Sequence, residues 1–96
     1  MALSNEIQTF LVSQIEYYTK ESKSYKEMAE GYNLDHDSVY DATFGIIVGC
    51  LYSSFLQIYT NQDSTPSSQE MEEFTETIIK NSKKIKDSIM ANDTKD

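Results

Sequence analysis

The feature that most constrains the fold of this chain is a stretch of 21 residues, 42–62, that contains no charged side chain. Drawn as a helix, its first half is apolar on every side, and a helix that is apolar all round is buried all round. The β-branched run at 46–48 would suit a strand, but the uninterrupted length and the lack of turn residues favour a helix over residues 38–60. Two neighbouring helices cannot surround such a helix, so we expect it to contact another chain.

Two amphipathic segments flank this central helix. Over residues 4–30, apolar side chains recur at steps of three, four or seven, which is the spacing of one helix face. Ser4 is a suitable N-cap, and Gly31 is placed to end the helix in a left-handed turn, although the polar stretch at 19–24 is compatible with a kink. Over residues 67–90, Ser67 and Glu70 have the spacing of a capping box, as do Ser38 and Asp41 at the start of the central helix.

These segments predict an all-α protein in which three helices form an up-down-up bundle. We expect one domain over residues 1–90, followed by a frayed tail at 91–96. A hydrophobic core this small usually needs further stabilisation from disulfide bonds, a structural metal or oligomerisation. Cys50 is the only cysteine and His36 the only histidine, so neither an internal disulfide nor a structural zinc site is available. Oligomerisation remains, and we predict a homodimer that completes a larger helical bundle.

Small residues recur at steps of four in the central helix, at Gly45, Gly49 and Ser53. Such a spacing lets two helix backbones approach closely. Because a glycine inside a helix costs up to about 1 kcal/mol, two of them indicate a packing interface that offsets the cost. The neighbour is either another helix of the same chain or the same helix of a second copy.

The segment at 67–90 is the second candidate for helix packing or for the dimer interface. Its apolar stripe includes Ile78, Ile85 and Ile89. Its charges are sorted, with glutamates at 70–76 and lysines at 80–86. An antiparallel copy would set the glutamates of one chain against the lysines of the other, as a two-fold interface requires.

Tyr18, Tyr25 and Tyr32 lie at seven-residue intervals and therefore share one helix face. One interpretation of this stripe is an aromatic surface on which a partner docks. The other is a half-buried packing seam whose hydroxyl groups remain hydrated.

The charge of the chain limits its partners. A net charge of −8 and the absence of arginine argue against nucleic-acid binding, which needs a concentrated basic surface. An acidic body instead favours a basic protein surface as a partner and is repelled by membranes. The N-terminal residues resemble no signal peptide, so we expect a cytoplasmic protein.

Residues 42–62 are long enough to cross a bilayer, which leaves a small single-span membrane protein as an alternative. Serine, threonine and glutamine residues dilute the hydrophobicity of this stretch, however. Acidic residues also lie at both ends of it, and no nearby lysine would orient it. We therefore favour a buried helix of a soluble domain.

An acidic cluster between Glu27 and Asp41 is the strongest candidate for chemistry. Glu27-x-x-Glu30 with Asp37-x-x-x-Asp41 resembles the carboxylates by which helical pyrophosphohydrolases hold magnesium, which implies a divalent-metal-dependent hydrolase as an alternative function. Such a site also needs cations for the phosphates, and the chain has none between Lys26 and Lys80. The leading hypothesis is a non-catalytic interaction module, such as an adaptor, a regulatory subunit or an inhibitor, with no catalytic, cofactor or metal site.

Overall fold

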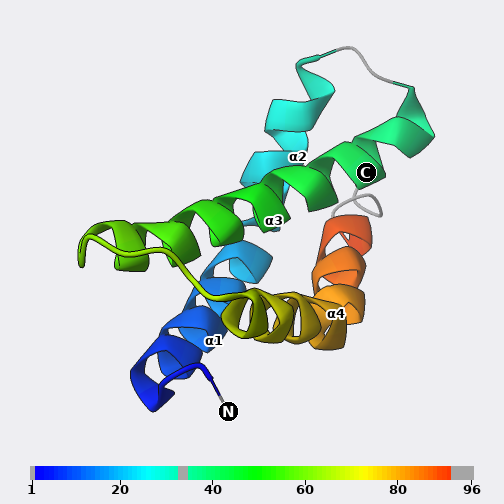
Figure 1. Ribbon diagram of the computed structural model, residues 1–96. Coiled ribbons are helices and arrows are strands. Elements are labelled where there is room, and N and C mark those ends of the chain that lie inside the picture. The colour runs from blue at the N-terminus through cyan, green and yellow to red at the C-terminus, as the bar shows by residue number, and fades with distance from the viewer. Residues whose placement is uncertain (1, 33–34, 92–96) are drawn as a thin grey trace.

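The computed structural model describes residues 2–32 and 35–91, and four α-helices make up most of this part of the chain. Its described residues contain no β-strand, so the prediction of an all-α fold is confirmed (Figure 1). Of the tail expected to fray, only Ala91 is described, as the last residue of a helix. The helices are α1 (Asn5–Lys20), α2 (Ser22–Glu30), α3 (His36–Thr60) and α4 (Ser68–Ala91).

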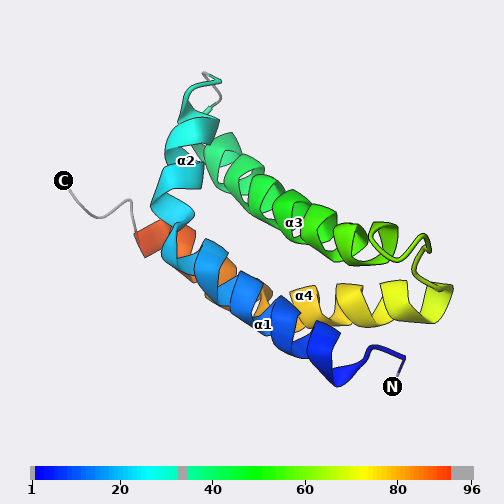
Figure 2. The same cartoon turned by 90° about the vertical axis from the view of Figure 1, so that its left-hand side faces the viewer.

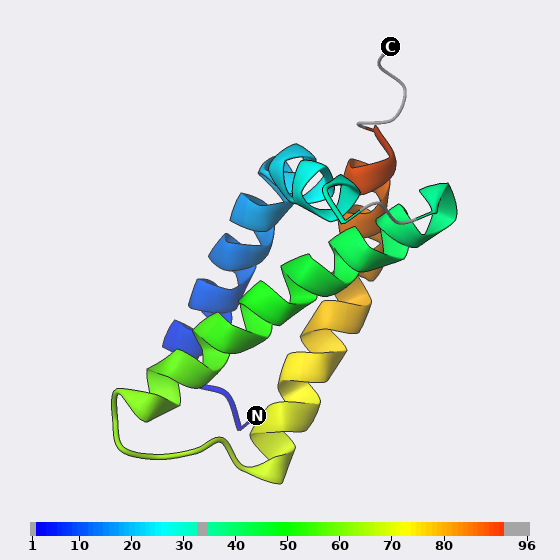
Figure 3. The same cartoon turned by 90° about the horizontal axis from the view of Figure 1, so that it is seen from above.

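The helices form two layers. α1 and α4 run in the same direction in one layer, and α3 crosses over both of them in the opposite direction (Figures 2 and 3). The short α2 turns away from the end of α1 toward the start of α3 (Figure 2). α3 is thus the central element of the chain, and one of its sides faces away from the other layer.

The helix expected over residues 4–30 is divided in two at Glu21, inside the polar stretch at 19–24 where the sequence was compatible with a kink. This residue has φ −95° and ψ 15°, outside the helical range, although its N–H still donates to the carbonyl of Tyr17 at 3.0 Å. The next residue, Ser22, is buried, and its Oγ donates to the carbonyl of Ser88 on α4 at 3.2 Å. The polar stretch at 19–24 is therefore a bend that is anchored to α4.

Two of the predicted caps are present. Oγ of Ser4 accepts a hydrogen bond from the N–H of Ile7 at 3.2 Å. At the start of α4, the N–H of Ser67 donates to Glu70 at 2.7 Å and the N–H of Glu70 donates to Oγ of Ser67 at 3.1 Å. Both bonds of the predicted capping box are therefore formed.

Two other predictions about helix ends are wrong. α3 begins two residues before Ser38, with Asp35 at its N-cap position, so Ser38 and Asp41 form no capping box. Gly31 follows α2 but has φ −65°, which is right-handed rather than left-handed. Any residue can adopt this conformation, so the turn does not depend on the glycine.

The core lies between α3 and the layer of α1 and α4. α3 contributes a buried residue at every fourth position, and Phe55 in this stripe stacks on Phe74 of α4 with ring centroids 4.7 Å apart. Beside this stripe, the partly buried Phe44, Val48 and Leu56 also pack against the core, so the exposed part of α3 is a narrow strip. The buried stripe comprises Val39, Thr43, Ile47, Leu51, Phe55 and Tyr59.

Candidate protein-interaction surface

The side of α3 that faces away from the core carries the small residues identified in the sequence. Gly45, Gly49 and Ser53 are all exposed. They lie opposite the buried stripe because they are offset from it by two positions, which is about 200° around a helix of 3.6 residues per turn. Exposed Tyr52 and Gln57 border them. We call these five residues the outer face of α3. Like all of residues 42–62, it contains no charged side chain.

Both glycines of the outer face lack a neighbour within the described part of the chain. A Cβ atom built on Gly45 or on Gly49 would have no atom within 4 Å, apart from those of its own helix backbone and adjacent residues. The close packing that the spacing predicts is therefore not supplied by α1, α2 or α4. Of the two neighbours expected from the sequence, a second chain remains.

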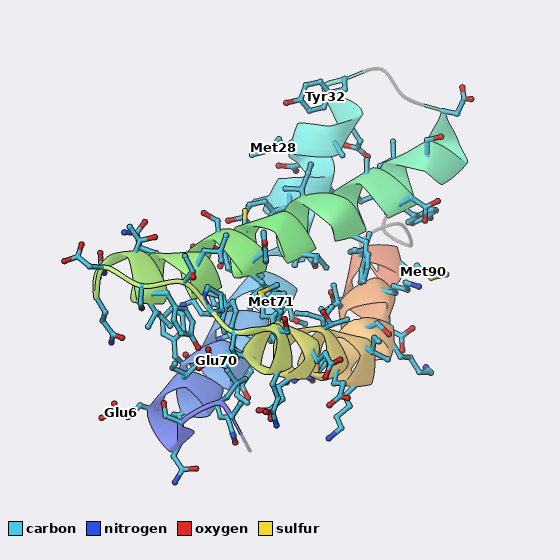
Figure 4. The ribbon with its side chains drawn as sticks, viewed as in Figure 1. Glu6, Met28, Tyr32, Glu70, Met71 and Met90 are labelled. Carbon is cyan, nitrogen blue, oxygen red and sulfur yellow. The ribbon has the colours of Figure 1, made fainter. Side chains whose placement is uncertain are left out.

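Tyr18 and Tyr25 lie beside this face and pack inside the chain. Their rings are 5.4 Å apart, and the Tyr18 hydroxyl interacts with Cys50 and Ser54 on α3. Both tyrosines are half-buried against the core, whereas Tyr32 is 68 % exposed at the end of α2 (Figure 4). The structure thus brings together two of the three tyrosines of the predicted stripe.

A fourth tyrosine, Tyr17, was not identified from the sequence because it lies outside the seven-residue spacing. Its ring packs edge-on against Tyr18 with centroids 5.0 Å apart, and half of its surface is exposed. The sequence pattern does not predict this contact, because adjacent residues of a helix do not face each other. Tyr17 therefore offers an exposed aromatic group next to the half-buried pair.

Burial is the main cause of a raised pKa at both half-buried tyrosines. The pKa of Tyr18 lies above its ordinary value of 10.0 because of desolvation and the neighbouring Cys50, while a hydrogen bond with Ser54 opposes the rise. Desolvation likewise raises the pKa of Tyr25, followed by the effect of the Tyr18 hydroxyl. Both hydroxyl groups are therefore neutral at physiological pH and provide hydrogen bonds rather than charge.

The isoleucines of α4 are part of the core. Ile78, Ile85 and Ile89 are between 0 and 7 % exposed, so they serve the packing of this chain's own helices and are not available to a second copy. The large apolar side chains that α4 exposes instead are Ile79, at 65 %, and Met90, at 54 %.

Several charged groups of α4 already have partners within the chain. Glu73 accepts hydrogen bonds from the backbone before α1, and Glu70 accepts one from the Tyr59 hydroxyl at 3.1 Å. Lys83 pairs with Asp87 at 2.8 Å, and Nζ of Lys86 lies 5.1 Å from the centroid of the Phe44 ring. These charges of α4 therefore already take part in contacts within the chain.

The acidic cluster at 27–41 does not form a metal site among the side chains that the structure describes. Glu27, Glu30, Asp35 and Asp41 are exposed, and the described part of the chain contains no group of three or more histidine, cysteine, aspartate or glutamate residues able to hold an ion. The side chains at 36 and 37 lie outside this description.

A cavity of about 340 Å³ lies between α3 and α4. Its wall is largely apolar and contains one lysine and one aspartate. The described wall therefore lacks the paired carboxylates or the nucleophile and base that a hydrolytic site needs. The lining residues are Tyr40, Asp41, Phe44, Lys86, Ile89 and Met90.

α3 is also the one helix of the described chain that is long and apolar enough to cross a membrane, over Ser38–Thr60 with a mean hydropathy of 1.4. The same helix provides Ile47, Leu51 and Phe55, which are all completely buried against its own chain. Crossing a bilayer would separate these side chains from α1 and α4. In this fold one face of the helix packs on α1 and α4, and 28 % of its membrane-length window is buried.

Comparisons with protein-family models, with curated proteins and with solved structures found no match for the chain. The candidate surface therefore rests on the geometry of this molecule. Its defining features are the exposed small residues of α3, the absence of charge along them, and the tyrosines on the adjacent edge of α1 and α2.

Proposed function

We propose that this chain is a non-catalytic, cytoplasmic protein-interaction module that acts as a homodimer joined through the outer face of α3. The observation that carries this proposal is the exposure of Gly45 and Gly49 with no neighbour within 4 Å of a Cβ. Each glycine weakens the helix by up to about 1 kcal/mol relative to alanine, and nothing in the described chain offsets that cost. A second helix backbone packed on this face would offset it.

The distribution of charge supports the same surface. Two copies with a net charge of −8 each repel one another over most of their surface. The outer face of α3 is uncharged along its whole length, so two copies can meet there without opposing carboxylates. α3 would then be covered on both sides, by its own core and by its partner.

The size of the face predicts a weak and reversible dimer. The outer face lies within residues 45–57, which at a rise of about 1.5 Å per residue is about 20 Å of helix. A strip of this length and one helix wide has an area of roughly 200 Å² on each copy, about a quarter of what each partner contributes to an interface of standard size. We therefore expect a dissociation constant in the micromolar range, with the flanking tyrosines adding to the contact.

Light scattering on a sizing column tests the proposal. At tens of micromolar or more, the mass should approach twice the 11.0 kDa of one chain, and dilution should lower it. Gly49→Leu fills the face without a clash inside its own chain, so it should fold and elute as a monomer. Thr75→Leu adds the same side chain at an exposed position of α4 and should leave the dimer intact.

Two results would overturn the proposal. One is a wild-type mass that stays at 11.0 kDa up to millimolar concentration. The other is a dimer that persists in Gly49→Leu and is lost when Lys83 and Lys84 are both replaced by glutamate, which would move the interface to α4.

A further inference from the structure

The positive charges of the described chain are confined to one end of the molecule. α1 and α4 run in the same direction, so the end of α1, the whole of α2 and the second half of α4 lie together, where α3 begins (Figures 2 and 3). We call this the lysine end. Its lysines are Lys20, Lys23, Lys26, Lys80, Lys83, Lys84 and Lys86. An equal number of described carboxylates lies among them, so the charges of this end balance; they are Glu16, Glu21, Glu27, Glu30, Asp35, Asp41 and Asp87.

The opposite end, where α1 and α4 begin and α3 ends, is acidic. Figure 4 shows Glu6 and Glu70 there, beside the first turns of α1 and α4. None of the lysines that the structure describes lies in this acidic end. Its carboxylates are Glu6, Asp63, Glu70, Glu72, Glu73 and Glu76.

From this polarity we infer that the second copy binds antiparallel, with the two-fold axis passing by Gly49; the inference rests on the proposed function. α3 runs from the lysine end to the acidic end, so antiparallel α3 helices place the acidic end of each copy beside the lysine end of the other. A parallel pair would place the two acidic ends together. The antiparallel orientation therefore avoids the repulsion between two acidic ends, on a face that is itself neutral.

The register follows from the side chains of α3. Gly49 lies at the middle of the helix, and a two-fold axis there sets Gly45 against the partner's Ser53, so small residues meet along the seam. On the flanks, Ile46 meets the partner's Tyr52. Asp41 meets the uncharged Gln57 of the partner subunit, whereas a parallel pair would bring the two copies of Asp41 together. In this register the large side chains of the two copies meet on the flanks, and small ones meet along the line of closest approach.

Disulfide trapping with single cysteines tests the orientation. The natural thiol is first removed by Cys50→Ser, a change of similar size at a half-buried position. Gly49→Cys, Ser53→Cys and Ile79→Cys are then made separately in this background. The first two positions are exposed on α3, and Ile79 is exposed on α4 as the matched control.

An antiparallel dimer centred on Gly49 brings the two copies of residue 49 within the Cα separation of a disulfide, about 4.4–6.8 Å. The two copies of residue 53 are then about 12 Å apart along the helix, since each is four residues from the axis. Because a side chain at position 49 weakens the dimer, the oxidation is carried out at a protein concentration well above the raised dissociation constant, where Gly49→Cys should cross-link and Ser53→Cys should not. Mixing Ser53→Cys with Gly45→Cys chains should give a mixed disulfide, because these positions face each other.

Other cross-linking patterns would distinguish a wrong orientation from a wrong interface. Self-cross-linking of both Gly49→Cys and Ser53→Cys would indicate parallel helices, which overturns the antiparallel inference and leaves the outer face of α3 as the interface. Cross-linking of Ile79→Cys alone would place the interface on α4 and overturn both. A dimer by light scattering in which none of the α3 cysteines cross-links would also overturn the inference.

Discussion

The backbone N–H of Leu3 donates a hydrogen bond at 2.9 Å to Oε1 of Glu73, 70 positions further along the chain. The N–H of Ala2 donates to Oε2 of the same carboxylate at 2.7 Å. Glu73 therefore ties the segment before α1 to α4 and holds Leu3 in the core, where it is only 4 % exposed. The bond from Ala2, and then that from Leu3, lowers the pKa of the Glu73 carboxyl group below its ordinary value of 4.5.

This contact predicts a loss of stability in acid. A folded-state pKa below the unfolded value means that Glu73 stabilises the fold above about pH 4.5, and that its contribution disappears as the pH falls through the lowered pKa. Glu73→Gln should be less stable than the wild type at neutral pH, and the difference should narrow in acid. Urea unfolding followed by circular dichroism at a series of pH values measures this. A difference that stays constant with pH would contradict the assignment.

A second prediction concerns alkaline solution. Burial, together with the hydrogen bond that its hydroxyl donates to Glu70, raises the pKa of Tyr59 from 10.0 to about 12. The contribution of Tyr59 is therefore complete below pH 10 and is lost as the pH rises toward about 12. Over this interval the wild type should lose more stability than Tyr59→Phe, which cannot ionise there. Urea midpoints of the two proteins across this range provide the measurement, and parallel declines would show that Tyr59 does not titrate as inferred.

The aromatic stack in the core should dominate stability. Phe55 is completely buried between Phe74 and Tyr59, so Phe55→Ala removes the ring and leaves a cavity. We expect a loss of about 3–5 kcal/mol, which is a large part of the stability of a domain of this size. Tyr52→Ala removes a ring that is 41 % exposed and also contacts Phe74, with centroids 5.7 Å apart, so it compares a half-exposed ring with a buried one and should cost less. Chemical denaturation of both variants at low concentration decides whether the ranking holds.

Periodicity in the sequence was sufficient for the helices and the core of this protein. It predicted an all-α fold and identified the apolar stripe of α4, and the structure places Ile78, Ile85 and Ile89 of that stripe in the core. The polar stretch at 19–24 was compatible with a kink, but the pattern did not show that the chain bends at Glu21 or that Ser22 there donates a hydrogen bond to Ser88 on another helix. Contacts between distant segments leave no signal in a local pattern.

The same limit applies to the candidate surface. The spacing of Gly45 and Gly49 identified a place for close packing, but spacing within one helix does not say which neighbour covers it. The sequence likewise could not show that Tyr18 reaches Ser54, because the two lie on different helices. The charge polarity of the molecule also depends on α1 and α4 running in the same direction, which only the fold reveals (Figure 3).

The last prediction concerns the glycines of the outer face. Replacing them by alanine should stabilise the separated chain and weaken the dimer. In the double variant Gly45→Ala with Gly49→Ala, each new Cβ meets no atom within 4 Å, and neither described glycine has a positive φ. Each substitution should therefore stabilise the separated chain by about 0.5–1 kcal/mol through helix propensity alone.

In the dimer the added methyl groups push the two α3 backbones apart, so the dissociation constant should rise on the order of tenfold, equivalent to about 1.4 kcal/mol. Denaturation at low concentration and sedimentation equilibrium at high concentration measure the two effects separately. Thr75→Ala, an exposed change on α4, should leave the dimer unaffected. If the double variant gains stability and associates as tightly as the wild type, no helix packs closely on this face, and the two glycines have another role.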